Sequence, residues 1–133
     1  MPLTEQMGEM IYGCDICQNV CPWNVKFSQA LADDSPFAAR AFIAGKDAVT
    51  LARDILALDQ DAFSAAFRKS PMKRAKLRGL QRSAAVVLGN AGRSDDIPLL
   101  KATQQCNDQL VAEHGEWALD ALSQSTRVAE GAE

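Results

Sequence analysis

Apolar residues recur at steps of three and four from Asp47 almost to the end of the chain, which is the spacing of amphipathic helices. Residues that cap or open helices divide this region into five predicted helices. They run from Asp47 to about Ala57, from Asp59 or Asp61 to include Phe67, from Ser70 and Pro71 to about Leu88, from Ser94 or Asp95 to include Ala102, and from Asn107 or Asp108 to about Ser123. The glycines of Gly89–Gly92 are expected to end the third helix.

The first 46 residues lack this periodicity, apart from a short helical lead-in expected over residues 1–13. Phe27, Phe37 and Phe42 are expected to pack around this N-terminal module, since large aromatic side chains are usually buried. The sequence thus predicts an N-terminal module over residues 1–46, a helical domain over residues 47–125 and a flexible tail over residues 126–133.

Two segments of the helical domain resemble each other. Gly79–Gly92 and Val111–Ser123 place Ala and Leu at matching steps, with a capped turn and a helix between them, which is typical of helical repeats. His114 lies on the apolar face of the second segment and is expected to be a packed core residue. The predicted fold is all-α: a short cysteine-rich turn followed by HEAT-like helical repeats.

Composition favours the same fold. Hydrophobic residues make up 47% of the chain, which argues against disorder, and aromatic residues only 6%, which favours helix over sheet. No apolar run is long enough for a membrane span, and no signal peptide opens the chain. We therefore expect a cytoplasmic protein without a membrane partner.

Positive charge is concentrated in one segment. Between Ala62 and Ser94 there is no Asp or Glu, and the eight basic residues there leave −11 for the rest of a chain whose net charge is −3. A segment without counter-charges is a candidate surface for a phosphate backbone, although an ordinary solvated helix face is the alternative. The candidate nucleic-acid contacts are Lys69, Lys73, Arg74, Lys76, Arg78 and Arg82.

Three cysteines near the N-terminus form the strongest chemical motif. Cys14, Cys17 and Cys21 follow the pattern C-x2-C-x3-C-P, the last part of the ligand run of bacterial ferredoxins, in which Ile11 occupies the position of the first ligand. In two-cluster ferredoxins the cysteine before proline binds the other cluster. We therefore expect Cys14 and Cys17 to bind one 4Fe–4S cluster and Cys21 a second, each cluster being only partly ligated by this chain.

Other uses of these cysteines stay open. A disulfide would leave one cysteine of the motif over, and a zinc site would need a fourth ligand, for which Cys106 and His114 are the candidates. Inert buried thiols are the third alternative.

The motifs together resemble the C-terminal part of the epoxyqueuosine reductase family. The resemblance covers Ile11 to Ser123 and includes the segments IYGCDICQNVCPWN, SPMKRAKLRGLQRSAAVVLGN and EHGEWALDAL. It implies an oxidoreductase that reduces epoxyqueuosine to queuosine in tRNA, with a cobalamin-binding catalytic domain, a ferredoxin-like module with two 4Fe–4S clusters and a HEAT-like domain. It also implies that the basic segment faces the tRNA anticodon stem-loop.

The cobalamin domain and the first cysteine run of that family are absent from this sequence, and no catalytic residue of the family can be placed on it. The chain is therefore expected to be a partial enzyme that works with its upstream part or with an electron donor, and Met1 an internal start. The alternative is a non-catalytic HEAT-type module that binds RNA or protein and carries vestigial cysteines. A third hypothesis is a small ferredoxin-like carrier that obtains its remaining ligands from a partner chain.

Overall fold

The computed structural model describes residues 3–32 and 34–130, with side chains described as far as Ser125. This part of the chain contains helices and turns and no strand, so the all-α prediction is confirmed. That its helices form HEAT-like repeats, and that the chain divides at residue 46, stay predictions. No helix in this part combines the length and the apolarity that crossing a membrane requires.

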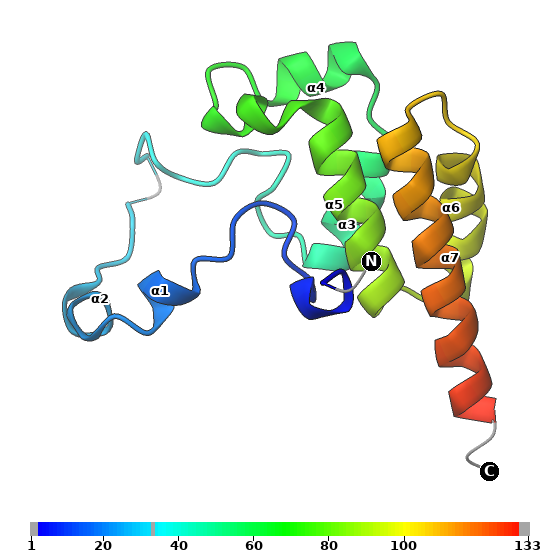
Figure 1. Cartoon of the computed structure of the whole chain (residues 1–133). Helices are drawn as coiled ribbons and strands as arrows, with labels where there is room; N and C mark the ends of the chain where they lie inside the picture. Colours follow the sequence, from blue (N-terminus) through cyan, green and yellow to red (C-terminus); the bar gives the residue numbers. More distant parts are fainter. Residues whose placement is uncertain (1–2, 33, 131–133) are drawn as a thin grey trace.

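Seven α-helices and three short 3-10 turns make up the described chain (Figure 1). The α-helices are α1 (Ile16–Asn19), α2 (Pro22–Phe27), α3 (Ala48–Leu56), α4 (Gln60–Ala66), α5 (Lys76–Ala91), α6 (Ile97–Gln104) and α7 (Gln109–Glu130). The 3-10 turns are η1 (Glu5–Met7), η2 (Pro71–Ala75) and η3 (Ser94–Asp96).

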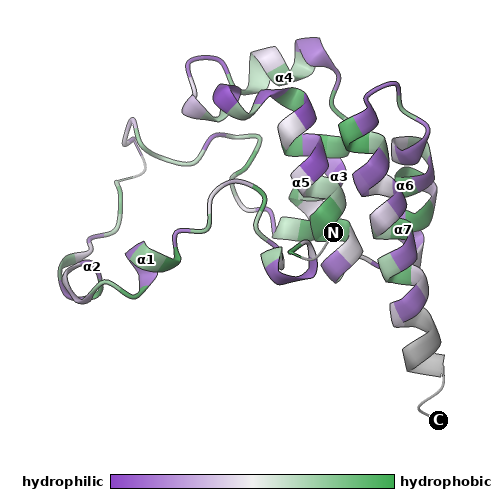
Figure 2. Ribbon diagram, in the orientation of Figure 1, coloured by the Kyte–Doolittle hydropathy of each residue, from purple (hydrophilic) through white to green (hydrophobic). Residues whose placement is uncertain are grey.

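Helix α5 is the centre of the helical domain. It packs against α3 and α7, and α6 packs against α7 (Figure 1). Every residue from Ser83 to Gly89 is buried, which only a helix covered on several sides can achieve. The buried residues of these helices are mostly apolar, and Figure 2 shows polar and apolar residues alternating along the helices.

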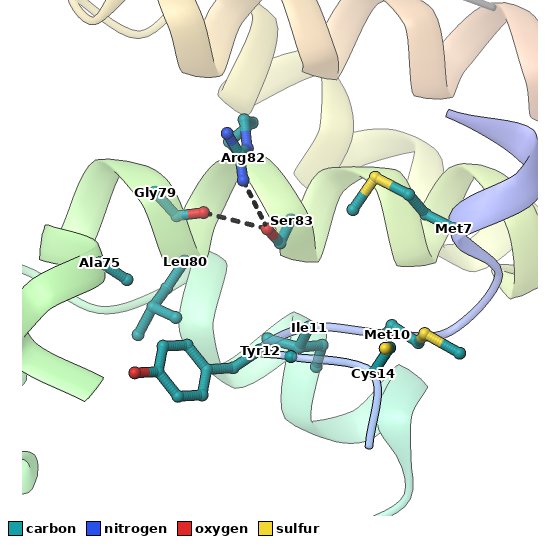
Figure 3. Close-up of a pocket in the computed structure, with 11 residues that line it drawn as sticks. Met7, Met10, Ile11, Tyr12, Cys14, Ala75, Gly79, Leu80, Arg82 and Ser83 are labelled. Carbon is teal, nitrogen blue, oxygen red and sulfur yellow. Dashed lines mark hydrogen bonds between the residues drawn. The ribbon is translucent and has the colours of Figure 1, made fainter. Parts of the chain in front are cut away.

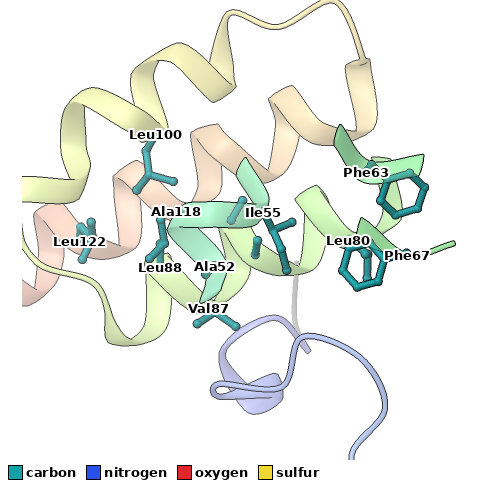
Figure 4. Close-up of a cluster of buried hydrophobic side chains, with 12 residues drawn as sticks. Ala52, Ile55, Phe63, Phe67, Leu80, Val87, Leu88, Leu100, Ala118 and Leu122 are labelled. Carbon is teal, nitrogen blue, oxygen red and sulfur yellow. The ribbon is translucent and has the colours of Figure 1, made fainter. Parts of the chain in front are cut away.

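The core brings together side chains from α3 to α7 (Figure 4). Phe67 packs on Phe63 and Phe42, with ring centroids 5.3 and 5.5 Å away, and closes one end of the core. The buried cluster consists of Ala52, Ile55, Phe63, Phe67, Leu80, Ala84, Ala85, Val87, Leu88, Leu100, Ala118 and Leu122. Burial of this apolar surface supplies most of the stability of a domain this small.

Capping side chains set the starts of the helices as predicted. The Asp47 carboxylate accepts the Thr50 N–H at 2.8 Å at the start of α3, and the Asp59 carboxylate accepts the Ala62 N–H at 2.7 Å at the start of α4. At α7 the Asp108 carboxylate accepts the Val111 N–H at 3.3 Å.

Three predicted helix limits are wrong. Pro71–Ala75 forms a 3-10 turn, and the α-helix begins only at Lys76, whose positive φ of 58° interrupts a continuous helix. Helix α5 continues past the expected limit at about Leu88 to Ala91, and Gly92, the last residue of the expected Gly89–Gly92 stop, forms its C-cap. The backbone of α7 stays helical to Glu130, since no Gly or Pro follows Ser123 before Gly131; residues 131–133 lie outside the described residues.

Residues 13–32 and 34–41 extend away from the helical domain as a long excursion that carries α1 and α2 (Figure 1). The expected packing of Phe27 and Phe37 is wrong: they are 57% and 83% exposed, and Phe27 stacks only on the exposed Trp23. Helices of four and six residues cannot cover such side chains by themselves. Of the three phenylalanines, only Phe42 packs against the core.

Candidate functional site

The cysteine motif lies at the start of this excursion. Cys14 follows Gly13, which has a φ of +71°; Cys17 lies in α1; and Cys21 precedes α2, whose first residue is Pro22. Proline at the first helical position has no N–H to satisfy, so α2 begins directly after the third cysteine. The motif thus spans two short helical turns joined at Val20 and Cys21.

All three thiols are free. Cys14 and Cys17 are exposed and Cys21 is half-buried. The disulfide alternative therefore has no support here, and the alternative of inert buried thiols does not suit two exposed cysteines. Exposed thiols next to helical turns are the donor type that iron–sulfur clusters use.

The motif does not bring enough donor side chains together to hold a metal by itself. Within the described residues, no three Cys, His, Asp or Glu side chains gather closely enough to hold a metal ion. Ile11, at the position of the missing ligand, is half-buried and packs against the core. The motif therefore suits an iron–sulfur cluster in donor chemistry and accessibility, but not in the number of donors.

The two candidate fourth ligands for zinc lie elsewhere. Cys106 is exposed in the turn between α6 and α7, where its Sγ lies 3.4 Å from the Asp108 carbonyl. His114 is half-buried on α7, and its Nδ1 lies 2.8 Å from the Leu110 carbonyl oxygen. Neither joins the cysteine motif in the described structure.

Two hydrogen-bonding side chains fix the segment before the motif on the helical domain. The Asn90 amide on α5 donates to the carbonyl oxygens of Thr4 at 3.1 Å and Gly8 at 3.0 Å. The Tyr12 hydroxyl donates to the Pro71 carbonyl oxygen at 3.4 Å. The chain is thereby anchored beside η2 just before Cys14, whereas Cys17 and Cys21 lie in the excursion beyond this anchor.

The basic residues fall into two groups. Lys69, Lys73, Arg74, Lys76 and Arg78 are exposed, or partly so, as a contact with a phosphate backbone requires. Arg82 is half-buried, and its Nη2 donates to the Ser83 hydroxyl at 3.3 Å, which makes it less accessible than its sequence position suggests.

The sequence suggested that the basic residues have no acidic partners, but one of them does. Asp108 from the turn before α7 pairs with Arg78, with 3.0 Å between Oδ2 and Nε. Among the described residues, Lys73, Arg74 and Lys76 form no ion pair with a carboxylate. The unpaired positive charge is therefore concentrated at η2 and the first residue of α5.

Sequence reasoning missed the contribution of Tyr12 to this region. The basic segment contains no aromatic residue after Phe67, and Tyr12 lies 59 positions before Pro71. Only the fold brings its side chain to the basic turn, by which we mean η2 with Lys73 and Arg74 and the following Lys76. No local pattern in the sequence could have shown that proximity.

The described structure therefore defines an all-α protein in which an exposed, cysteine-rich segment is tied to the basic turn of a helical domain. Neither a family model nor a solved structure matches this chain. Curated proteins do match it, among them epoxyqueuosine reductases from several bacteria.

The epoxyqueuosine reductase of Yersinia pestis is 39% identical to this chain over 114 residues, covering 85% of this chain and 26% of that protein. The one of Xanthomonas campestris is 37% identical over 118 residues, covering 88% and 32%. The one of Alicycliphilus denitrificans is 39% identical over 123 residues, covering 85% and 32%.

The chain is therefore a homologue of the C-terminal part of epoxyqueuosine reductases, and the resemblance predicted from its motifs is confirmed. It spans about a quarter to a third of the length of the curated relatives it matches.

Proposed function

We propose that this chain acts as the C-terminal part of an epoxyqueuosine reductase, an oxidoreductase that reduces epoxyqueuosine to queuosine in tRNA in the cytoplasm. The observation that carries the proposal is the similarity to enzymes of that name over most of the chain. The match to the Vibrio cholerae enzyme covers 90% of this chain. So little of the chain is left unmatched that the match contains the basic segment and at least most of the cysteine segment, at whichever residue it begins.

In this proposal the cysteines contribute to electron transfer. Cys14 and Cys17 would hold one 4Fe–4S cluster and Cys21 a second, and the remaining ligands would come from outside the described motif. The clusters, when bound, supply single electrons. Cobalamin would belong to an N-terminal catalytic domain of such an enzyme, and no residue of this chain is assigned a catalytic role.

The basic turn would hold the RNA. Lys73, Arg74 and Lys76, which form no ion pair in the described structure, can neutralise phosphates of an anticodon stem-loop and release their counterions. Because Tyr12 anchors the chain beside this turn, Cys14, two residues further on, would lie near the bound RNA.

The test uses the native polypeptide, tagged at its C-terminus in its source cells and purified anaerobically. We expect iron and acid-labile sulfide together, and conversion of epoxyqueuosine to queuosine in tRNA, measured by mass spectrometry of its nucleosides. Cys14→Ser or Cys17→Ser should remove metal and activity, whereas Cys106→Ser, outside the motif, should change neither. Zinc in place of iron would overturn the proposal.

One observation favours a second candidate function. In the described structure no three potential metal ligands lie together, while the basic turn is accessible. A non-catalytic RNA- or protein-binding module with vestigial cysteines would show these features. In that case the triple variant with Ser at positions 14, 17 and 21 would bind an anticodon hairpin as the unaltered protein does, and the native polypeptide would contain no iron.

A further inference from the structure

A cavity of about 620 Å³ separates the segment before the cysteines from helix α5 (Figure 3). Met10, Ile11 and Tyr12 line it on one side, and Ala75, Gly79 and Leu80 line it on the other. Its size is that of pockets that bury small organic ligands, and its lining is mostly apolar. Cys14 and Met10 lie at one end, and Tyr12 and Ala75 at the other (Figure 3).

The end at Tyr12 carries an aromatic ring that is held in place. Tyr12 is 45% exposed, so part of its ring is available for contact with a ligand. Its hydroxyl donates to the Pro71 carbonyl oxygen at 3.4 Å, which fixes the ring beside the basic turn. Aromatic rings next to cationic groups are the usual platforms for unstacked nucleobases.

Exposed basic residues adjoin this end in the sequence, although they do not line the cavity. Ala75 lines the cavity, and its neighbours in sequence, Arg74 and Lys76, are both accessible to solvent. Neither forms an ion pair with a carboxylate of the described residues. An apolar cavity with an aromatic wall, beside a turn that carries exposed cations, suits a nucleotide: the faces of the base are flat and apolar, and its phosphates are anionic.

We propose that this cavity binds an unstacked nucleobase of single-stranded RNA, with the base against Tyr12 and a phosphate outside the cavity on the exposed Arg74. This inference deepens the proposed function and rests on its RNA contact. The site selects unpaired over paired nucleotides, because a base inside a duplex cannot enter the cavity.

Gly79 offers a variant that fills the cavity without harming the fold. A Cβ added there would meet nothing nearer than Ala75 Cβ at 3.7 Å, and both Ala and Leu favour a helix more than Gly does. Gly79→Leu should therefore occupy the cavity, while Gly79→Ala adds one methyl group and serves as the matched control. Tyr12→Ala and Tyr12→Phe form a second pair, of which Phe keeps the stacking ring and loses only the hydroxyl group.

The full chain is titrated with an anticodon-type hairpin RNA and with a blunt RNA duplex of equal charge, with binding followed by fluorescence anisotropy. We expect Gly79→Leu and Tyr12→Ala to weaken hairpin binding on the order of tenfold, by the same factor at low and high salt, and to leave duplex binding unchanged. Gly79→Ala should bind both RNAs as the unaltered chain does, and Tyr12→Phe should lose less hairpin affinity than Tyr12→Ala, because it keeps the ring and loses only the bond to Pro71. A 2-aminopurine in the loop should change its fluorescence on binding, and Gly79→Leu should abolish this change.

Two kinds of result would overturn the inference, and only the second would also overturn the proposed RNA contact. Hairpin binding that Gly79→Leu leaves unchanged, or an equal loss for hairpin and duplex, removes the base site and leaves the proposed RNA contact intact. An unaltered chain that binds neither RNA removes the RNA contact and, with it, the base site.

Discussion

Arg53 on α3 binds Asp96, the last residue of η3, through two hydrogen bonds: Nε donates to Oδ1 at 2.6 Å and Nη2 to Oδ2 at 3.1 Å. The Asp96 side chain is only 3% exposed and also accepts the Arg93 N–H at 2.8 Å. The pair therefore ties α3 to the turn between α5 and α6, and the buried carboxylate is well satisfied.

This pair predicts how stability depends on pH. The hydrogen bonds from Arg53 hold the pKa of the Asp96 carboxyl below its usual value, against burial, which raises it, and with help from the Arg93 N–H. The pKa of Asp96 is therefore lower in the folded than in the unfolded protein. The contribution of the pair to the free energy of unfolding is complete above the unfolded pKa, about 3.9, and is lost as the pH falls through the folded pKa. Asp96→Asn should lower the free energy of unfolding at pH 7 by about 1–3 kcal/mol, and by less near pH 3.

Urea unfolding at pH 7, 5 and 3 measures this difference. Asp54→Asn is the control, because the Lys46–Asp54 pair is partly exposed on both sides, and such pairs contribute about 0–1 kcal/mol. A constant effect of Asp96→Asn at all three pH values would contradict the assignment.

Two glycines of α5 should respond in opposite directions to the same substitution. A Cβ at Gly89 would lie 2.6 Å from Trp117 Cζ3 and 3.0 Å from Ala118 Cα, so Gly89→Ala pushes α5 away from α7 and should destabilise the fold by about 1–3 kcal/mol. Gly79→Ala meets no such contact and should stabilise it by about 0.5–1 kcal/mol. Thermal unfolding measures both, and a stabilising Gly89→Ala would show that the two helices are less closely packed than described.

The segment before the cysteines depends on one side chain of α5. Asn90→Ala removes both hydrogen bonds to Thr4 and Gly8, so this segment should open more often, at a cost of about 1–2 kcal/mol. Hydrogen exchange measured by mass spectrometry should become faster in residues 4–13 and stay unchanged in α7. Asn107→Ala, at an exposed position before α7, should change neither.

RNA affinity should depend on which basic residue is altered. Lys73→Glu and Arg74→Glu should each lower the affinity for an anticodon hairpin several-fold and reduce its salt dependence, since each side chain is exposed and forms no ion pair in the described structure. Arg78→Glu should lower the affinity less, because Arg78 is already paired with Asp108 and is less available to a phosphate. Lys101→Glu, exposed on α6, is the control. Equal effects at all four positions would indicate attraction by net charge alone.

Local patterns in the sequence predicted much of the fold, for a physical reason. A helix cap such as Asp47 or Asp59 acts on N–H groups two or three residues away, and an apolar stripe repeats within one helix, so both are visible in the sequence. The end of α5 was expected at about Leu88 instead of Ala91, because a helix-ending glycine and a close-packing glycine look alike until Trp117 is placed against Gly89.

In the candidate site, too, the local features could be predicted from the sequence and the long-range contacts could not. The cysteine spacing and the basic segment are local, and both were found. The positions of Tyr12 at the basic turn and of Asp108 on Arg78 depend on residues brought together across 59 and 30 positions of the chain, so only the fold could show them. Phe27 and Phe37 were expected to be buried by residue type alone, and the described chain offers them no cover.

Thiol reactivity provides the last prediction. The four cysteines are free, with Cys14, Cys17 and Cys106 exposed and Cys21 half-buried at the start of α2. Without metal, a colorimetric thiol reagent should modify three thiols quickly and Cys21 more slowly, because reaction requires access to the sulfur. If the motif binds an iron–sulfur cluster in the native polypeptide, only Cys106 should react quickly before iron is removed, and a chelator should restore the rest. Full reactivity of all four thiols in an iron-containing preparation would mean that the iron is held elsewhere.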